Sequence, residues 1–352
     1  MVVVVGIDVH KGTHCAVAVD EAGRQLERPM MVRATDAGHR QLLRWAQRSF
    51  AEDRVEFAVE DCRHVSGRLE RALLDAAAAV IRVPPKLMAQ TRSSARTRGK
   101  SDPIDALAIA RAALREPDLP RAEHTHASRE VKHLVDHRED LVNMRTGLQS
   151  RLRWHLHDLD PDLDPPHRGL DRFAVLDQLE NRLQSLPAST VRRIALEQLT
   201  DIRALTVRIN GLEKELADLV QAQAPQLLTL PGCGVLTAAK LVGETANPTR
   251  FRSEACFAMH AGVAPIPASS GKTDRYRLAR GGNRQLNAAL HRIAVTQIRL
   301  SGLGQIYYQR RRANGDSTME ALRALKRRLA RVVFHLLRPT DSAAGTCLSA
   351  AA

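Results

Sequence analysis

The sequence predicts an α/β domain at the N-terminus, then a long helical region, then a basic and mostly helical C-terminal domain. Three observations support this division. Apolar, β-branched runs alternate with helical patterns over residues 1–118, and leucines recur at heptad spacing over 119–224. Lys and Arg are concentrated among helical segments over 225–338. The tail, 339–352, consists of small and polar residues, and we expect it to be disordered.

Five strands and three helices are predicted in the first region. Three strands follow one another directly, and helices and strands alternate after them, which is the order typical of a ribonuclease H-like α/β fold. Pro29 lies in the third strand and predicts that this strand forms an edge of the sheet. The predicted strands are Met1–Val9, Thr13–Val19, Gln25–Val32, Arg54–Glu60 and Ala79–Val83, and the helices are Asp36–Ser49, Ser66–Ala76 and one beginning near Asp102.

The central region has the apolar spacing of long packed helices. One helix is predicted from about Ser128 to His157 and another around residues 202–219, with a proline-rich linker, 158–172, after the first. The heptad spacing predicts either an antiparallel hairpin within the chain or a coiled coil between chains. The seam residues are Leu134, Leu141 and Leu148 in the first helix, and Ile202, Leu205, Ile209, Leu212, Leu216 and Leu219 in the second.

The charge balance indicates a polyanionic partner. The chain has 53 Lys and Arg against 39 Asp and Glu, a net charge of +14. A protein this basic gains affinity for nucleic acid because each neutralised phosphate releases condensed counterions. A GC-rich genome would explain the preference for Arg over Lys, but not the net excess. Aromatic residues make up 3% of the chain, which argues against a base-stacking platform.

The cysteines and the N-terminus indicate an intracellular protein. The five cysteines are an odd number without C-x-x-C spacing, so we expect neither a zinc site nor a disulfide framework. Asp8 interrupts the first apolar run, which therefore does not resemble a signal peptide. No apolar run approaches the ~18 residues of a membrane span. We expect a soluble protein of the cytoplasm that is not associated with a membrane.

Four acidic residues are candidates for a metal site. Asp8 ends the apolar strand VVVVGID, and Glu60 ends VEFAVE. Asp102 and Asp105 lie three residues apart at a predicted helix start, and therefore on one face. Acids at neighbouring strand ends would repel one another unless a cation neutralised them, and phosphoryl transfer by metal ions uses such clusters. The set therefore predicts a site for Mg²⁺ or Mn²⁺.

Each acid also has a simpler interpretation. Asp102 followed by Pro103 is a good N-terminal cap of a helix, Asp8 could be a turn residue, and Asp61 competes with Glu60. The order of the acids within one domain length favours the metal site over these separate roles. The neighbouring residues His10, Lys11 and His14 are expected to be polar loop residues and not metal ligands.

The C-terminal region contains candidate contacts to nucleic acid. The turn Leu230–Gly234 is typical of a helix-hairpin-helix, in which Gly232 and Gly234 would let backbone amides approach a DNA phosphate. The same pattern also occurs in ordinary turns between helices. The clusters Arg310–Arg312 and Lys326–Arg328 either contact nucleic acid or are solvated helix faces, and the sequence favours neither interpretation.

Several blocks of the chain resemble the DEDD-type insertion-sequence transposases, whose architecture a pilin-gene invertase shares. The N-terminal blocks are GIDVHKGTHCAVAVDEAG, VEDCRHVSGRLERAL and RVPPKLMAQTRSSARTRGKSDPIDALAIAR. The C-terminal blocks are LLTLPGCGVLTAAKLVGE and FRSEACFAMHAGVAPIPASSGKTDRYRLARGGNRQLNAAL. The resemblance covers about 1–118 and 225–338 in the same order, and implies a RuvC-like N-terminal domain and a C-terminal serine domain.

The resemblance implies specific roles for residues of both domains. Asp8, Glu60, Asp102 and Asp105 correspond to the acidic tetrad, and Ser270 before Gly271 corresponds to a nucleophile, with Ser269 as the neighbouring alternative. Basic side chains near this serine could stabilise a pentavalent phosphate, namely Lys272, Arg275, Arg277 and Arg280. The resemblance also implies DNA as substrate, a noncoding guide RNA, and a dimer or tetramer whose domains combine across subunits.

Three other functions are compatible with parts of the sequence. A RuvC-like junction nuclease would use the same acids with water as the nucleophile. An ATPase of the sugar-kinase or actin type also opens with a strand ending in GID, but it needs a second glycine-rich phosphate loop that this sequence lacks. A non-catalytic protein could bind DNA through the helix-hairpin-helix alone.

Overall fold

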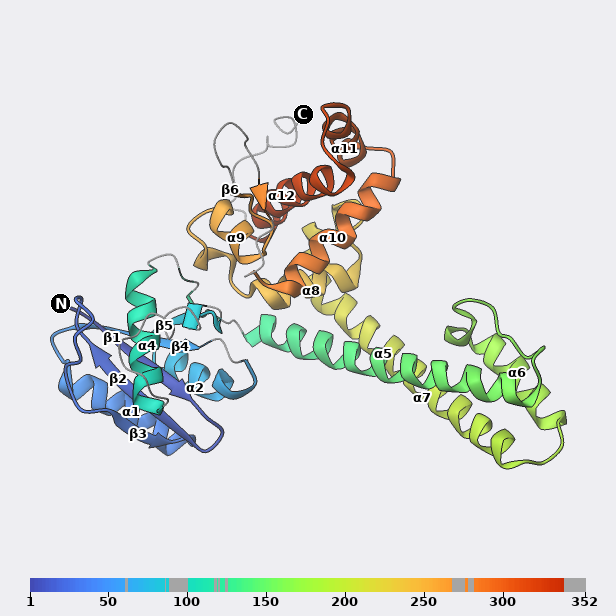
Figure 1. Cartoon of the computed structure of the whole chain (residues 1–352), viewed down its shortest axis with the longest axis horizontal. Helices are drawn as coiled ribbons and strands as arrows, with labels where there is room; N and C mark the ends of the chain where they lie inside the picture. The colour runs from blue at the N-terminus through green and yellow to red at the C-terminus, as the bar shows by residue number, and fades with distance from the viewer. Residues whose placement is uncertain are drawn as a thin grey trace. The chain divides into compact units, whose positions relative to one another are not determined.

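The computed structural model describes residues 1–60, 63–85, 87–88, 101–116, 119, 121–123, 126–267, 276–277 and 282–338 (Figure 1). The chain divides into two compact units. The first contains Met1–Thr125, Asn247–Asn287 and Lys326–Arg338, and the second contains His126–Ala246 and Ala288–Leu325. Among the described residues, no helix is long and apolar enough to cross a membrane.

A five-stranded sheet forms the centre of the N-terminal domain. Its order is β3 (Met30–Arg33), β2 (Thr13–Val19), β1 (Val2–Val9), β4 (Arg54–Glu60) and β5 (Ala79–Val83). The first three strands along the chain pair antiparallel, whereas β1, β4 and β5 run parallel. This topology confirms the ribonuclease H-like fold that the order of elements predicted.

The third strand differs in length from the prediction. It begins at Met30, after Pro29, and not at Gln25, which instead forms an isolated bridge to Val19. The proline ring removes a backbone donor, so regular pairing cannot extend through this position. The strand lies at the edge of the sheet, as Pro29 predicted.

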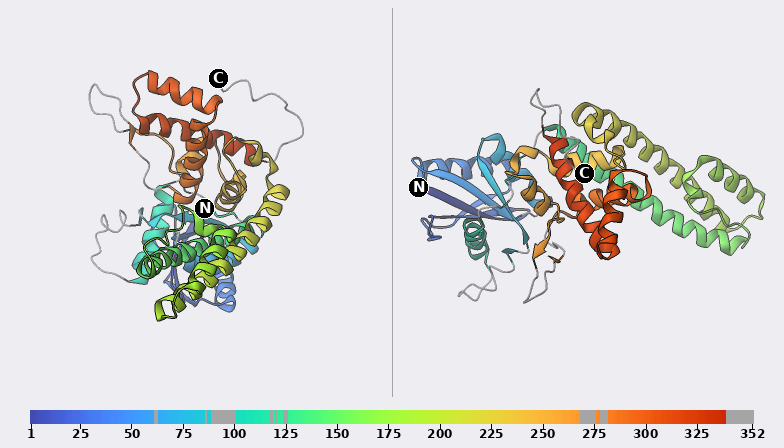
Figure 2. Two further views of the ribbon diagram at one scale, coloured as in Figure 1. Left: turned by 90° about the vertical axis from the view of Figure 1, so that its right-hand side faces the viewer. Right: turned by 90° about the horizontal axis from the view of Figure 1, so that it is seen from above.

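Helices cover both faces of the sheet (Figures 1 and 2). Alternation along β1 turns Val3, Val5 and Ile7 toward a core shared with α1 (Asp36–Ser49) and α2 (Arg63–Asp75). The intervening positions face α4 (Asp102–Arg115), whose alanines form the opposite core together with Val4. The central strand is therefore buried on both faces, and Asp8 lies on the α4 face because it continues the series of Val4 and Gly6.

The central region forms an antiparallel pair of long helices, α5 (His126–Leu159) and α7 (Thr190–Gln223) (Figure 1). Leu141 packs with Leu205 and Ile209 between them, so the heptad seams meet within one chain. Two elements between these helices were not predicted, the 3₁₀ turn Gly169–Asp171 and α6 (Phe173–Ser185). Leucines of α6 bury themselves against α5 and α7 at one end of the pair.

The remaining elements belong to the C-terminal region. They are 3₁₀ turns at Pro225–Thr229 and Pro248–Arg250, α8 (Val235–Thr245), α9 (Glu254–His260), β6 (Ile266–Pro267), β7 (Tyr276–Arg277), α10 (Arg284–Arg299), α11 (Leu303–Ala313) and α12 (Thr318–Leu337). Within the second unit, α8 packs on α5 so closely that a Cβ at Gly243 would lie 2.9 Å from the Cα of Lys132. Lys132 pairs with Glu244 at 2.5 Å, and Lys240 pairs with Glu139.

Two histidines are buried in the core between β2 and α1. The Nε2 atoms of His14 and His39 lie 3.2 Å apart, and the ring planes are 15° from parallel. The ring centroids are separated by 5.3 Å, close to the N–N distance plus the two ring radii, so the rings meet end to end and one Nε2 group can donate to the other. Neither Nδ1 atom has a hydrogen-bond partner among the described residues. Burial, followed by the charge of His39, lowers the pKa of His14 to about 4, and burial also lowers the pKa of His39.

The histidine pair predicts acid sensitivity of folding. Because the pKa of His14 is lower in the folded chain than its ordinary value of 6.5, the unfolded chain binds the proton first as the pH falls. Stability is therefore full above pH 6.5 and declines toward pH 4, by about 2 kcal/mol at pH 5 for a shift of this size. Urea unfolding at pH 7.5 and pH 5 measures this loss. The double variant His14→Leu, His39→Leu should lose less stability over the same interval, and an equal loss would contradict the prediction.

Candidate active site

Two acids lie at the carboxyl ends of adjacent parallel strands. The register pairs Ile7 of β1 with Val59 of β4, so the next residues, Asp8 and Glu60, occupy corresponding positions. Side-chain alternation places both on the face that α4 covers. Asp8 is 7% exposed, and Glu60 is half-buried. Asp8 also pairs with Cys15 on the antiparallel side, so it lies well inside the sheet and not at an edge.

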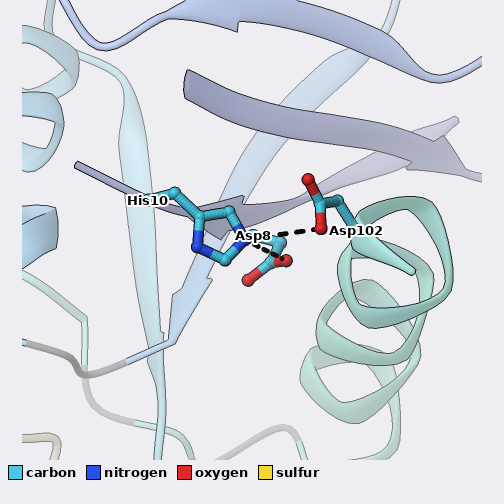
Figure 3. A group of neighbouring side chains, drawn as sticks. All are labelled: Asp8, His10 and Asp102. Carbon is cyan, nitrogen blue, oxygen red and sulfur yellow. Dashed lines mark hydrogen bonds and ion pairs between the residues drawn. The ribbon is translucent and has the colours of Figure 1, made fainter. Parts of the chain in front are cut away.

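The first turn of α4 brings two further acids to this corner. Ser101 is the N-cap residue, so Asp102 and Asp105 are first-turn acids and Asp102 is not the cap. An Asp102 carboxylate oxygen lies 3.5 Å from Nε2 of His10, and the same nitrogen lies 3.1 Å from Oδ2 of Asp8 (Figure 3). Asp105, one turn along the helix, is buried.

The acids interact with one another electrostatically. The pKa of Asp8 is raised, first by burial and then by the negative charges of Asp105 and Asp102, while His10 opposes the shift. A carboxylate held in such surroundings favours a cation close to it. Asp8, His10 and Asp102 present one ligand atom each, and these atoms all lie within 4.8 Å of one another. A set of ligands dominated by carboxylate oxygens fits a hard divalent cation such as Mg²⁺ or Mn²⁺.

The sequence interpretation of His10 was incomplete. We expected a polar loop residue, but the structure puts its ring against two of the acids. The spacing of His10, two residues after Asp8, was the available signal, because side chains at i and i+2 of a strand lie on one face. His10 does lie in the loop after β1, whereas the loop prediction was wrong for His14, which belongs to β2 and is buried in the opposite core.

The predicted nucleophile and most of its basic neighbours lie outside the described residues. These are Ser269, Ser270, Gly271, Lys272, Arg275 and Arg280. The backbone on both sides of the serines is described, and Pro267 of β6 pairs antiparallel with Tyr276 of β7. Arg277 belongs to β7 and pairs with Ile266. In the sequence, the serines therefore fall between β6 and β7.

Hydrogen bonds of the half-buried Asn287 hold the chain beside this hairpin. The Nδ2 group of Asn287 donates to the carbonyl oxygens of Ala261, at 3.2 Å, and Gly262, at 2.8 Å. Its Oδ1 atom accepts from Nζ of Lys326 at 2.5 Å. A Cβ at Gly282 would lie 2.2 Å from the backbone nitrogen of Gly262, so the chain segments entering and leaving the hairpin are in direct backbone contact.

The two basic clusters have different surroundings. In Lys326–Arg328, Lys326 is buried and Arg327 lies 3.5 Å from Glu254, so neither of these two is simply part of a solvated face. In Arg310–Arg312, Arg310 is exposed with its guanidinium 5.5 Å from the centroid of the Tyr307 ring. The second cluster is therefore the better candidate for contact with a polyanion.

The two glycines of the predicted helix-hairpin-helix differ in their constraints. Gly232 has φ +84°, and a Cβ there would lie 2.9 Å from Cβ of Thr296. Gly234 is the N-cap of α8 with an ordinary φ of −80°, and a Cβ there would meet nothing within 4 Å. Gly232 thus has a structural reason to be glycine. Gly234 is exposed and a side chain there would have open space, so a phosphate contact at the start of α8 stays a prediction.

Comparisons with known proteins agree on one family. A family model described as a transposase, of the DEDD type found in IS110, matches residues 5–161, and a model for the transposase IS116/IS110/IS902 family matches residues 224–309. A 44.8 kDa protein of insertion element IS116 from Streptomyces clavuligerus is 25% identical over 95% of this chain and 94% of its own length. A protein of element IS900 from Mycobacterium paratuberculosis is 26% identical over 95% of both chains.

A protein of element IS110 from Streptomyces coelicolor is 33% identical over 47% of this chain and 42% of its own length. Among solved structures, T. thermophilus RuvC in complex with a Holliday junction substrate aligns with 35% of this chain and 100% of its own, at a TM-score of 0.27 and 17% identity.

The acid cluster predicts a specific response to metal. MnCl₂ should raise the melting temperature of the full chain by a few degrees when its concentration is well above the dissociation constant, because the ion binds only the folded state. Asp8→Asn should abolish this rise. Without metal it should be no less stable than the wild type, because the charged form of a carboxyl group with a raised pKa is unfavourable in the fold. Asp75→Asn, at the exposed end of α2, is the control and should respond like the wild type. An unchanged response in Asp8→Asn would exclude this site.

The two glycines of the turn predict opposite outcomes. Gly232→Ala should lower the free energy of unfolding by about 1–3 kcal/mol, the usual cost of a strained positive φ. Gly234→Ala should cost under about 1 kcal/mol, as expected at an N-cap, but should weaken binding to a labelled DNA duplex. Urea unfolding and fluorescence anisotropy measure the two effects. If Gly234→Ala binds DNA as the wild type does, the turn serves packing alone.

Proposed function

Because the chain belongs to the family of DEDD-type insertion-sequence transposases, which includes IS110 and IS116, and is a DNA-processing enzyme, we propose that it breaks and rejoins DNA strands by serine attack assisted by a divalent metal ion. The observation that carries this proposal is the cluster of acids where β1, β4 and α4 meet. A buried and a half-buried carboxylate at the carboxyl ends of parallel strands, with a raised pKa at Asp8, are suited to neutralisation by a cation that also contacts a phosphate.

Asp8, Glu60, Asp102 and Asp105 would hold the cation, with His10 beside them. Mg²⁺ or Mn²⁺ bound there supplies Lewis-acid polarisation of the scissile phosphate. Asp8 is the central ligand because its pairing with Cys15 fixes it at the end of the central strand and the charges of the two acids of α4 raise its pKa. Glu60 contributes from the neighbouring strand at the same level.

Ser270 is the proposed nucleophile. Its Oγ attacks the phosphorus, the bond from phosphorus to one sugar oxygen breaks, and that oxygen gains a proton as the hydroxyl proton leaves to a base. The resulting phosphoserine ester conserves the energy of the phosphodiester bond for rejoining. Lys272, Arg275, Arg277 and Arg280 stabilise the charge of the pentavalent phosphate. Hydrogen bonds from Asn287 hold the backbone at Ala261 and Gly262, shortly before β6.

DNA is the proposed substrate at both element ends and target. The net charge of +14 and the open N-terminus of α8 at Gly234 support contacts to phosphates, with Gly232 shaping the turn. Family resemblance supports a noncoding guide RNA bound by the N-terminal domain and the long helices. It also supports a dimer or tetramer in which the acidic and serine domains combine across subunits. A transposase with these partners would act at the nucleoid in the bacterial cytoplasm.

A second candidate is a RuvC-like nuclease in which water replaces the serine. The acid cluster favours it, because these residues would be sufficient for hydrolysis. A non-catalytic DNA-binding protein is a weaker alternative, since it gives the buried acids no role. Loss of metal-dependent strand exchange in Asp8→Asn would exclude it.

Replacement of the serine distinguishes the two enzymatic candidates. The wild type should form a covalent protein–DNA adduct on DNA carrying the element ends, in the presence of Mg²⁺ and the noncoding RNA of the element. Ser270→Ala should form none and should not exchange strands, whereas Ser269→Ala is the matched control and should retain both activities. Denaturing electrophoresis followed by mass spectrometry of the adducted peptide measures this outcome. Continued cleavage by Ser270→Ala without an adduct would support the water-dependent nuclease instead.

A further inference from the structure

Gly6 interrupts the run of large apolar residues in the central strand. Its φ is not in the left-handed region, so the backbone conformation alone does not require glycine. A Cβ at this position would lie 2.1 Å from the carbonyl oxygen of Ala106, 2.5 Å from the amide nitrogen of Ala110 and 2.8 Å from the Cβ of Ala110. The backbone of α4 therefore rests directly on the backbone of β1, a common reason for glycine inside a strand.

On both the strand and the helix, the next residue along the same face from this contact is an acid. Asp102, Ala106 and Ala110 are spaced four apart and share one stripe of α4. Two residues along a strand and four along a helix both advance about 6 to 7 Å. Asp8 lies two residues beyond Gly6 on the strand, and Asp102 lies four residues before Ala106 on the helix. Both acids are therefore displaced by a similar distance from the contact between Gly6 and Ala106, and they lie at the same level.

A second contact fixes the far end of α4. Nε of Arg111 donates to the carbonyl oxygen of Gly23 at 3.0 Å, in the turn after β2. Gly23 has φ +75°, and the side chain of Arg111 packs against it. With the helix fixed at Arg111 and in backbone contact at Gly6, its first turn has little freedom to move away from Asp8.

We propose that Gly6 is a positioning residue for the metal site: by lacking a side chain, it sets the separation of α4 from β1 at which Asp8 and the acids of α4 can share a small divalent cation. This inference rests on the proposed metal site. A methyl group at Gly6 would force the helix back by roughly an ångström or more before ordinary contact distances are restored.

Such a displacement affects small and large ions differently. Mg²⁺ requires ligands at about 2.0–2.1 Å in near-octahedral geometry, whereas Ca²⁺ accepts about 2.3–2.6 Å in flexible geometry. A separation wider by an ångström should therefore weaken Mg²⁺ binding more than Ca²⁺ binding. A purely structural role for Gly6 would lower stability without changing this selectivity.

The experiment compares MgCl₂ and CaCl₂ titrations of the melting temperature for the full-length wild type, Gly6→Ala and Gly67→Ala. Gly67 is the matched control because it lies exposed on α2 in the same domain, where a Cβ would meet nothing within 4 Å. Gly6→Ala should lose at least about tenfold in apparent Mg²⁺ affinity, with a smaller loss for Ca²⁺. Gly67→Ala should retain the wild-type affinities.

Ala110→Val should also displace α4 from β1. It adds volume at Gly6 from the helix side, and it replaces Gly6→Ala if that variant does not fold. A folded variant with the wild-type ratio of Mg²⁺ to Ca²⁺ affinity would overturn the role of Gly6 while leaving the metal site intact. No rise in melting temperature with either ion in the wild type would overturn the metal site itself, and this inference with it.

Discussion

Carboxylates that share a buried corner repel one another, and this repulsion constrains the N-terminal domain. Asp8 pairs with Cys15 of β2 and is buried, so its side chain cannot move into solvent without disturbing the central strand. The first turn of α4 adds Asp102 and Asp105 to the same corner, and both raise the pKa of Asp8. Folding therefore creates a position where a cation is favoured. The acids stay close together because the packing of both cores fixes β1 against α4.

In the second unit, ion pairs and close backbone packing hold α8 against α5. Lys132 and Lys240 pair with Glu244 and Glu139, which join α8 to the start of α5. Buried ion pairs contribute little net stability, but they impose a particular docking because any other arrangement would leave a buried charge unpaired. The close approach at Gly243 excludes alternatives on steric grounds as well. The N-terminus of α8 and the long helical pair should therefore move as one body when DNA is bound.

The basic residues also have more than one purpose. The overall excess of positive charge indicates a nucleic-acid partner, but Lys326 donates to Asn287 inside the fold and Arg327 lies against Glu254. Arg310, in contrast, is exposed on α11. Two basic runs of similar composition thus have different roles. Lys326–Arg328 makes contacts within the fold, whereas Arg310–Arg312 exposes a guanidinium group to solvent.

The sequence by itself determined the order of elements in the N-terminal domain, the edge position marked by Pro29 and the acids at the strand ends, because alternation and strand termination are local properties of the chain. Only the tertiary structure decided that the heptad seams meet within one chain and that His10 contacts the acids. The inward direction of Lys326 and the reason for glycine at position 6 also became visible only there. Each of these depends on the partner that a distant segment presents, and a local pattern carries no information about that partner.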